Sequence, residues 1–312
     1  MPLAVGHERS DRTFQGNVSR VTFKSMALRT LRSLLVVFVA IAVLLLLFQH
    51  QLIYHPRKYR PIYREKLPIN TVELKYQTSQ GKQQCFYVPQ RDSTLKVPAR
   101  VWVMFPGNAS LALDWLEFLA EAPDRSDAFL LIDYPGYGEC EGSASPDAIQ
   151  ESVNKAVVEL AGTLNTSHKE LDERLNVIGL SIGCATALQF AAQHPIRHVV
   201  LIAPFTTLRE ESRRIVGFPL CYLLLHNYDN RTRLAELASR QNPPAVTIFH
   251  GSADSTIPPA MGRELAALFP KMIGFHEVPG ADHNSILAAA LAKIDWSMKP
   301  LPPRLPLVKD SF

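Results

Sequence analysis

The residues with the clearest chemical potential lie in the pentapeptide Gly-x-Ser-x-Gly at Gly179–Gly183, with Ser181 at its centre. A serine hydroxyl becomes a useful nucleophile when a sharp strand-to-helix turn, a nucleophile elbow, holds it above the fold beside a base. Because glycine lacks a Cβ, Gly179 and Gly183 would avoid collisions with the neighbouring strand or helix as this turn tightens. The pentapeptide alone is weak, since an ordinary serine between a strand and a helix can have the same neighbours.

The flanking sequence favours the nucleophilic interpretation. Residues 175–179 are apolar enough for a buried strand, and residues 184–194 are rich in small side chains and end before Pro195. This composition is typical of a helix that packs closely on a sheet. Ser181 would therefore lie in the turn between the two elements.

A serine at such an elbow takes its acid and its base from loops at the carboxyl ends of later strands, in the chain order serine, acid, histidine. Asp254 follows a strand predicted at residues 245–250, and His283 follows the last predicted strand, residues 273–278. His283 would accept the Ser181 proton and later return it to the leaving group. Asp254 would hold the tautomer of the imidazole and stabilise the imidazolium.

The oxyanion formed during acyl transfer needs two aligned N–H donors. In the expected arrangement one is the backbone N–H of Ile182, after the nucleophile, and the other that of Asn108, in the loop after the third predicted strand. The composition of this loop also suits a plain turn. Asp282 is adjacent to His283, so its side chain should point elsewhere, and we expect no role for it in the triad.

The order of predicted elements indicates an α/β fold with a mainly parallel sheet covered by helices on both faces. A hairpin formed by residues 71–78 and 84–88 opens it. Strands and helices then alternate. Strands are predicted at 99–105, 128–133, 175–179, 198–205, 245–250 and 273–278, and helices at 111–122, 145–164, 184–194, 258–269 and 286–296. Residues 206–244 contain the apolar stretch 217–225. Residues 218–225 of this stretch could line an acyl channel, or they could be ordinary core or a short helix under the edge of the sheet.

An apolar segment precedes the predicted sheet. Residues 34–48 carry no charge, and with residues 49–54 they reach about the 20 residues that a bilayer core requires. A signal peptide is disfavoured because no small-x-small cleavage site follows. A buried core helix is disfavoured because the segment is apolar all round and flanked by arginines. We predict an uncleaved single-pass anchor in the lipid bilayer.

The side of the membrane is less clear from the sequence. Basic residues close to the segment are more numerous after it than before it, which favours a cytosolic catalytic domain. Sequons at Asn108, Asn165 and Asn230 lie in the domain, and a glycan on Asn108 would occupy the proposed oxyanion loop. Both observations favour the cytosolic face. A single N-terminal anchor with a large following domain is, however, also the usual form of a protein with a luminal domain.

Charge and composition exclude several classes of function. Residues 1–66 hold eleven Lys or Arg against three Asp or Glu, so the remaining chain has twenty-two basic and twenty-six acidic residues. A nucleic-acid partner would need the opposite distribution. The four cysteines lie far apart without a metal-ligand spacing, and we expect no metal and no cofactor. The predicted regions are a basic, mostly disordered arm 1–33, an anchor 34–54, a juxtamembrane linker 55–69, a catalytic domain 70–297 and a proline-rich tail 298–312.

Several motifs together resemble the membrane-anchored abhydrolase-domain proteins of the α/β-hydrolase superfamily, near the serine-aminopeptidase-like hydrolases. The resemblance spans residues 70–296, with Leu52–Pro56 after the apolar segment also similar. One departure is Pro106, where the family usually has histidine. Another is the arm, which lacks the cysteine cluster of the depalmitoylating members. The motifs that carry it are Phe105–Ser110, Asp133–Gly142, Gly179–Gly183, His250–Asp254 with Ile257–Gly262, and Ala281–Asn284.

This resemblance and the triad together predict a membrane-tethered serine hydrolase that cleaves an ester or thioester of a lipid or another acylated small molecule through an acyl-enzyme. Two alternatives stay open. The same triad hydrolyses amides, so the protein could be a serine peptidase, or it could be an idle membrane scaffold that retains the fold. The sequence predicts neither the acyl chain nor the oligomeric state.

Overall fold

The chain forms two units that divide between Gln49 and His50. The computed structural model describes residues 11–90, 97–121 and 127–299, and of residues 11–25 the backbone alone. Most of the first unit is a single helix, α1 (Asp11–Ile53), whose last turn belongs to the second unit. Residues 1–10 of the predicted arm and the proline-rich tail from residue 300 lie outside the described residues.

Helix α1 is longer than the sequence interpretation allowed, because residues 11–33 are helical where a disordered arm was expected. The segment contains no proline and a single glycine, Gly16, so nothing in its backbone chemistry stops the helix. Residues Met26–Ile53 are long and apolar enough to cross a membrane. Four successive side chains, residues 34–37, are 55 to 67% exposed, so within its own unit no face of this helix is covered as a core helix would be.

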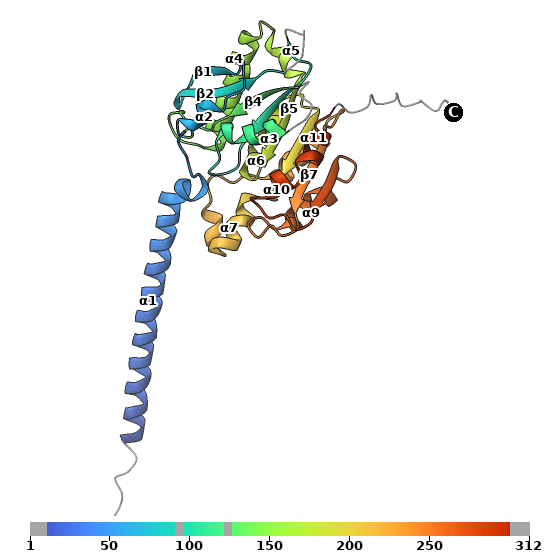
Figure 1. Ribbon diagram of the computed structural model, residues 1–312. Helices are drawn as coiled ribbons and strands as arrows, with labels where there is room; N and C mark the ends of the chain where they lie inside the picture. The colour runs from blue at the N-terminus through green and yellow to red at the C-terminus, as the bar shows by residue number, and fades with distance from the viewer. Residues whose placement is uncertain (1–10, 91–96, 122–126, 300–312) are drawn as a thin grey trace, which may run out of the picture. The chain divides into compact units, whose positions relative to one another are not determined.

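The described part of the second unit is built on one eight-stranded sheet of order β1-β2-β4-β3-β5-β6-β7-β8 (Figure 1). The pairs β1–β2 and β2–β4 are antiparallel, and the other neighbours are parallel. The mainly parallel sheet predicted from the sequence is thus confirmed. The strands are β1 (Val72–Thr78), β2 (Gly81–Val88), β3 (Val101–Phe105), β4 (Ala128–Ile132), β5 (Leu175–Leu180), β6 (His198–Ile202), β7 (Ala245–Gly251) and β8 (Ile273–Val278).

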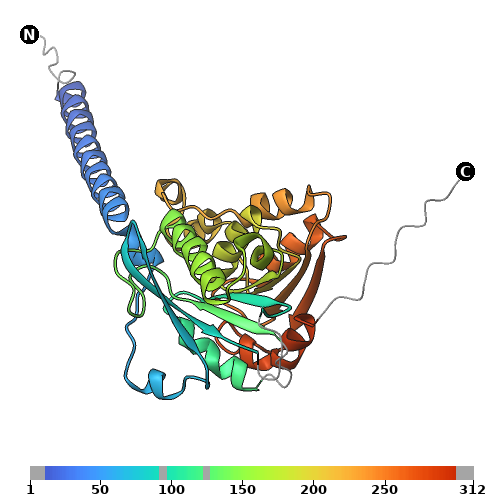
Figure 2. The same ribbon diagram turned by 90° about the horizontal axis from the view of Figure 1, so that it is seen from above.

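Helices cover both faces of the sheet (Figure 2). Side chains alternate between the faces along each strand, so Val103 joins one core cluster while Trp102 and Met104 join the other. Helices α4, α6, α8 and α9 pack in the first cluster, and α3, α10 and α11 in the second. After α1, the helices are α2 (Ile62–Glu65), η1 (Ala112–Asp114), α3 (Trp115–Glu121), α4 (Pro146–Thr163), α5 (His168–Asp172), α6 (Ile182–Gln193), α7 (Leu208–Val216), η2 (Leu220–Leu223), α8 (Asn230–Ala238), α9 (Pro259–Leu268), α10 (Ile286–Ala289) and α11 (Leu291–Ser297).

The second unit begins at His50 rather than at residue 70, because the predicted juxtamembrane linker packs on the sheet-bearing part of the unit. The Tyr59 hydroxyl donates to Asp133 Oδ2 at 2.5 Å, and Arg57 Nη1 lies 3.1 Å from Asp114 Oδ2. The sequence predicts only a juxtamembrane linker for residues 55–69. Their partners are more than fifty positions away in the chain, which no local pattern could indicate.

Residues 206–244, to which the sequence interpretation assigned no elements, contain α7, η2 and α8. Within the apolar stretch 217–225, Cys221 is buried, whereas Phe218 and Tyr222 are 72% and 60% exposed. This stretch is therefore not ordinary core.

Candidate active site

Ser181 lies at the turn from β5 into α6, in a backbone conformation that only a tight turn imposes. Its φ of 56° and ψ of −119° place a non-glycine residue in a strained, left-handed region. The Ser181 N–H donates to the Ile202 carbonyl oxygen at 2.9 Å and so fixes the turn to the neighbouring strand β6. The geometry is that of a nucleophile elbow.

The two elbow glycines leave no room for a side chain. A Cβ added to Gly179 would lie 2.3 Å from the Gly183 carbonyl oxygen, and one added to Gly183 would lie 2.3 Å from the Phe105 carbonyl oxygen. Both distances are far below van der Waals contact, and both obstacles are backbone atoms. The turn can therefore be this tight only with glycine at both positions.

Ser181, His283 and Asp254 form a continuous chain of hydrogen bonds. His283 Nε2 lies 3.0 Å from Ser181 Oγ, and His283 Nδ1 lies 2.8 Å from Asp254 Oδ2. The two contacts join residues from the ends of β5, β7 and β8, because the carboxyl ends of parallel strands meet at one edge of a sheet. The order serine, histidine, acid is the one that general-base activation of a hydroxyl requires.

The Asp254 carboxylate is buried and held by its own loop. Its Oδ1 accepts the backbone N–H groups of Thr256 at 2.9 Å and Ile257 at 2.8 Å. Burial acts to raise the pKa of Asp254, but hydrogen bonding from His250, His283 and the Ile257 N–H more than offsets it, so the pKa lies well below its ordinary value. Asp254 is therefore charged at neutral pH and can hold a proton on His283 Nδ1.

His250 is a site neighbour that the sequence interpretation did not single out. It is fully buried on β7, with Nε2 2.9 Å from the Ile257 carbonyl oxygen and 3.5 Å from Asp254 Oδ2. His250 Nε2–H therefore donates its hydrogen bond mainly to the Ile257 carbonyl oxygen. It interacts with the Asp254 carboxylate over the longer distance. The signal was present, since a histidine lies four positions before Asp254 in a strand whose one other polar side chain is that of Thr247.

Asp282 does not take part in this chain of contacts. It is exposed, and its Oδ1 accepts the backbone N–H groups of Asn284 at 3.0 Å and Ser285 at 2.8 Å, and the Ser285 hydroxyl at 2.8 Å. These bonds lower its pKa. They organise the loop that carries His283, in agreement with the expectation that Asp282 is not the triad acid.

The sequence predicts the backbone N–H groups of Ile182 and Asn108 as the two oxyanion donors. Among the hydrogen bonds of the described residues, none comes from the N–H of Ile182 or Asn108. The loop that holds Asn108 is fixed, because the Tyr134 hydroxyl donates to the Pro106 carbonyl oxygen at 2.8 Å. Because proline retains its carbonyl group, Pro106 can accept this hydrogen bond as any other residue would.

The Asn108 side chain ties the loop to the end of α1. Its Nδ2 donates to the Ile53 carbonyl oxygen at 2.7 Å, while its Oδ1 accepts the His55 N–H at 3.0 Å and the Tyr137 hydroxyl at 3.1 Å. The sequence offered no signal for these contacts. They make residues 53–55 part of the framework that positions the proposed oxyanion donors.

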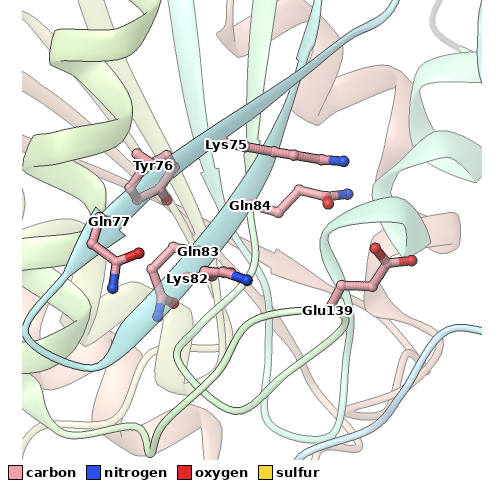
Figure 3. A pocket seen from close by; sticks show the side chains of 7 residues that line it. All are labelled: Lys75, Tyr76, Gln77, Lys82, Gln83, Gln84 and Glu139. Carbon is pink, nitrogen blue, oxygen red and sulfur yellow. The ribbon is translucent and has the colours of Figure 1, made fainter.

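A cavity of about 450 Å³ lies elsewhere, on the β1–β2 hairpin (Figure 3). Its lining contains none of Ser181, Asp254 and His283, so it is separate from the candidate active site. Within the described ranges, no cluster of three or more His, Cys, Asp or Glu side chains is arranged to hold a metal ion. The side chains that line the cavity are Lys75, Tyr76, Gln77, Lys82, Gln83, Gln84 and Glu139.

Comparison with known proteins gives a consistent picture. Residues 102–233 match the model of the alpha/beta hydrolase family, a range that includes Ser181 but ends before Asp254 and His283. An uncharacterised protein of Mycobacterium tuberculosis is 30% identical over 156 residues. That alignment covers 50% of this chain and 52% of the relative, so the chain spans about half the length of the relative.

Solved structures share the fold at low sequence identity. An alpha-beta hydrolase of Vibrio vulnificus has a TM-score of 0.61 and 15% identity, over 80% of this chain and 92% of that one. An esterase of Pyrococcus furiosus has a TM-score of 0.58 and 14% identity, over 78% and 96%. The family match over residues 102–233 and these structures together show that the chain has the alpha/beta hydrolase fold.

Proposed function

We propose that the protein is a membrane-tethered serine hydrolase that cleaves an ester or thioester of an acylated or lipid substrate. The observation that carries the proposal is the chain of hydrogen-bond contacts from Ser181 Oγ through His283 to Asp254, at a strained elbow. Each of these features alone also occurs in proteins where it has only a structural role. Their combination is what acyl transfer through a serine requires.

The geometry implies a two-step reaction. His283 Nε2 takes the proton of Ser181 as the hydroxyl oxygen attacks the carbonyl carbon, and the N–H groups of Ile182 and Asn108 stabilise the resulting oxyanion. His283 then protonates the departing alcohol or thiol, which leaves an acyl ester on Ser181. A water molecule gives its proton to His283 and attacks this ester, which releases the acid and restores the hydroxyl.

The membrane part of the proposal is supported by helix α1. Residues Met26–Ile53 are apolar, exposed and 28 residues long. A bilayer core needs about 20 apolar residues, so this segment is long enough to cross. Resistance of the full-length protein to extraction by alkaline carbonate tests the anchor, and release into the soluble fraction would contradict it.

Labelling with a fluorophosphonate tests the nucleophile. Only an activated serine reacts with this probe at a useful rate, so Ser181→Ala should remove all labelling. Ser255→Ala is the matched control, because Ser255 is an exposed hydroxyl in the loop that carries Asp254, and it should label like the wild type. Labelling that persists in folded Ser181→Ala protein would overturn the assignment. A panel of p-nitrophenyl esters and acyl thioesters would then define the substrate class.

We also propose that the catalytic domain faces the cytosol, and Asn165 is the residue that can report on it. Asn230 is fully buried and donates to the Phe205 carbonyl oxygen, and the Asn108 side chain is engaged with Ile53. Asn165 is exposed. Digestion with an endoglycosidase should leave the mobility of the protein unchanged. A shift that disappears in Asn165→Gln would place the domain in the lumen instead.

A further inference from the structure

The segment from Ile215 to Leu225 exposes an unusual amount of apolar surface. Ile215, Phe218, Tyr222 and Leu225 are 82%, 72%, 60% and 71% exposed, and they lie at the end of α7 and around η2. We refer to these four side chains as the apolar patch. Scattered exposed apolar residues are normal, but a gathering of large ones within one short segment marks an interaction surface.

We propose that the apolar patch docks on the lipid bilayer beside the point where the anchor leaves it. The patch is continuous with that point, because the residues that follow it contact the end of α1. The His226 ring lies 6.4 Å from the ring of His50 and 5.8 Å from that of Tyr54, and the Tyr54 and Tyr228 hydroxyls are 3.1 Å apart. Leu225 is the immediate neighbour of His226. If residues 26–53 cross the bilayer, the chain leaves it at Tyr54. The Tyr54 ring contacts that of His226, the residue after the last member of the patch.

The composition of α7 and η2 favours lipid over other occupants. Aromatic rings and basic side chains occur together there, as they do at membrane interfaces. The Arg209 guanidinium lies 5.4 Å from the centre of the Tyr222 ring, and Arg213 is exposed one turn further along α7. The acidic residues of the helix are paired with basic side chains, Glu210 with Arg231 and Glu211 with Arg214.

Docking at the patch would bring the candidate active site to the membrane surface. Arg214 Nη1, one residue before Ile215, donates to the Thr256 carbonyl oxygen at 3.0 Å. The N–H of the same Thr256 donates to the Asp254 carboxylate. The patch is thus connected to the loop of the triad acid through one side chain.

A label at the patch tests the docking in the full-length protein. Phe218→Cys is labelled with a nitrobenzoxadiazole dye and reconstituted in phosphatidylcholine–phosphatidylglycerol vesicles, and the four native cysteines are all buried. Val158→Cys is the control, because Val158 is a half-exposed apolar residue in the C-terminal half of α4 and lies outside the apolar patch. Lipids with a spin label in the acyl chain should quench the dye at residue 218 and not at residue 158. Absent quenching at residue 218, or equal quenching at both, would overturn the proposal.

Activity gives a second and independent measure. The triple variant Ile215→Ser, Phe218→Ser, Tyr222→Ser should turn over a water-soluble p-nitrophenyl ester like the wild type. Its turnover of an ester embedded in vesicles should fall by about tenfold or more, because each buried apolar side chain contributes at least that factor to binding. The control is Val158→Ser with Leu268→Ser, two apolar residues that are each 50% exposed and lie outside the apolar patch, and it should show no loss. Equal loss on both substrates would contradict docking.

The docking rests on the membrane anchor of the proposed function, and the outcomes separate the two. Protein that resists carbonate extraction but has an unquenched dye at residue 218 contradicts the docking and leaves the anchor standing. Protein that is released by carbonate contradicts the anchor and the docking together. Fluorophosphonate labelling of Ser181 reports on the nucleophile in either case.

Discussion

Two buried carboxyl groups follow the ends of strands, Asp133 after β4 and Asp254 after β7. Their pKa values are shifted in opposite directions. The two residues are 1% and 4% exposed, so burial does not distinguish them. Burial raises the pKa of Asp133 to about 7, against hydrogen bonds from the Ala112 N–H and the Tyr59 hydroxyl that lower it. The pKa of Asp254 lies below its ordinary value.

The difference is in the partners. Asp254 has two backbone N–H donors and two histidines close to it, one of which can become a cation. Asp133 has one N–H and one hydroxyl, at 2.8 and 2.5 Å, and neither can take a charge that balances its own. A buried carboxylate can therefore serve as the acid of a triad only where its surroundings keep it ionised. Both residues follow buried strands, so their position in the fold does not separate them.

The largest expected effect is on kcat, when the carboxylate proposed for catalysis, Asp254, is replaced. Asp254→Asn should lower kcat by about 10⁴-fold, because the amide cannot hold the required tautomer of His283 or stabilise its cation. His283→Ala should have a similar effect. Asp133→Asn is the matched control, since it neutralises an equally buried carboxyl, and its kcat should stay within about tenfold of the wild type. Comparable losses in Asp133→Asn and Asp254→Asn would abolish the distinction.

A pair of glycine substitutions tests the same contrast through the backbone. A Cβ on Gly251 would lie 2.3 Å from the Ala281 carbonyl oxygen, just before the loop of His283, while one on Gly138 would lie 2.5 Å from Asp133 Oδ2. Gly251→Ala should displace His283 and lower kcat by about 10²-fold, which is the effect of a small misplacement. Gly138→Ala should mainly lower the melting temperature. A Gly138→Ala protein with normal stability and lost activity would show that the Asp133 loop takes part in catalysis.

The pH dependence of stability should differ between the two carboxyls. In the folded state Asp133 binds a proton more strongly than in the unfolded chain, where its pKa is about 3.9, so its contribution to stability falls as the pH rises from about 4 through 7. Asp254 has a depressed pKa, so its contribution is present above about pH 4 and is lost as the pH falls below that value. Melting temperatures in detergent, measured against pH, should lose the fall between pH 4 and 7 in Asp133→Asn. A slope that survives in this variant belongs to another group.

The smallest effect is expected at Asp282. Its carboxylate is exposed and accepts bonds from its own loop, and an asparagine oxygen can accept the same N–H groups of Asn284 and Ser285. Asp282→Asn should therefore keep kcat within about twofold of the wild type. If this variant instead loses activity as Asp254→Asn is expected to, the acid of the triad has been assigned to the wrong residue.

The sheet and the elbow were predictable because their signals are local. Apolar strands such as β5 and β7 reveal themselves by composition, and Ser181, Asp254 and His283 follow strand ends in a known order. Helix α7 was missed because six of its nine residues are polar or charged, so it has no apolar stripe that the sequence would reveal. Its place depends on contacts such as that of Arg214 with Thr256, forty-two positions away.

The contacts around residues 50–60 were beyond reach for a related reason. Tyr54, His55 and Tyr59 belong to a stretch of interleaved aromatic and basic residues, a composition typical of a membrane interface. Their actual partners, among them Tyr228 and Asn108, come from distant loops. Composition indicates which type of surface a segment can contact. Only the folded structure shows which surface it contacts.

The bond between Asn108 and Ile53 determines where this protein can be cut. A water-soluble version that starts at residue 70, the boundary suggested by composition, would lack the carbonyl of Ile53 and the N–H of His55 that hold the Asn108 side chain. It would also lose the tyrosine that satisfies buried Asp133. The truncated protein would keep Ser181, His283 and Asp254, but the loop that holds the proposed oxyanion donor Asn108 would be less well positioned, so its kcat should fall. A truncation meant for assay or crystallisation should therefore begin at or before His50, where the globular unit itself begins.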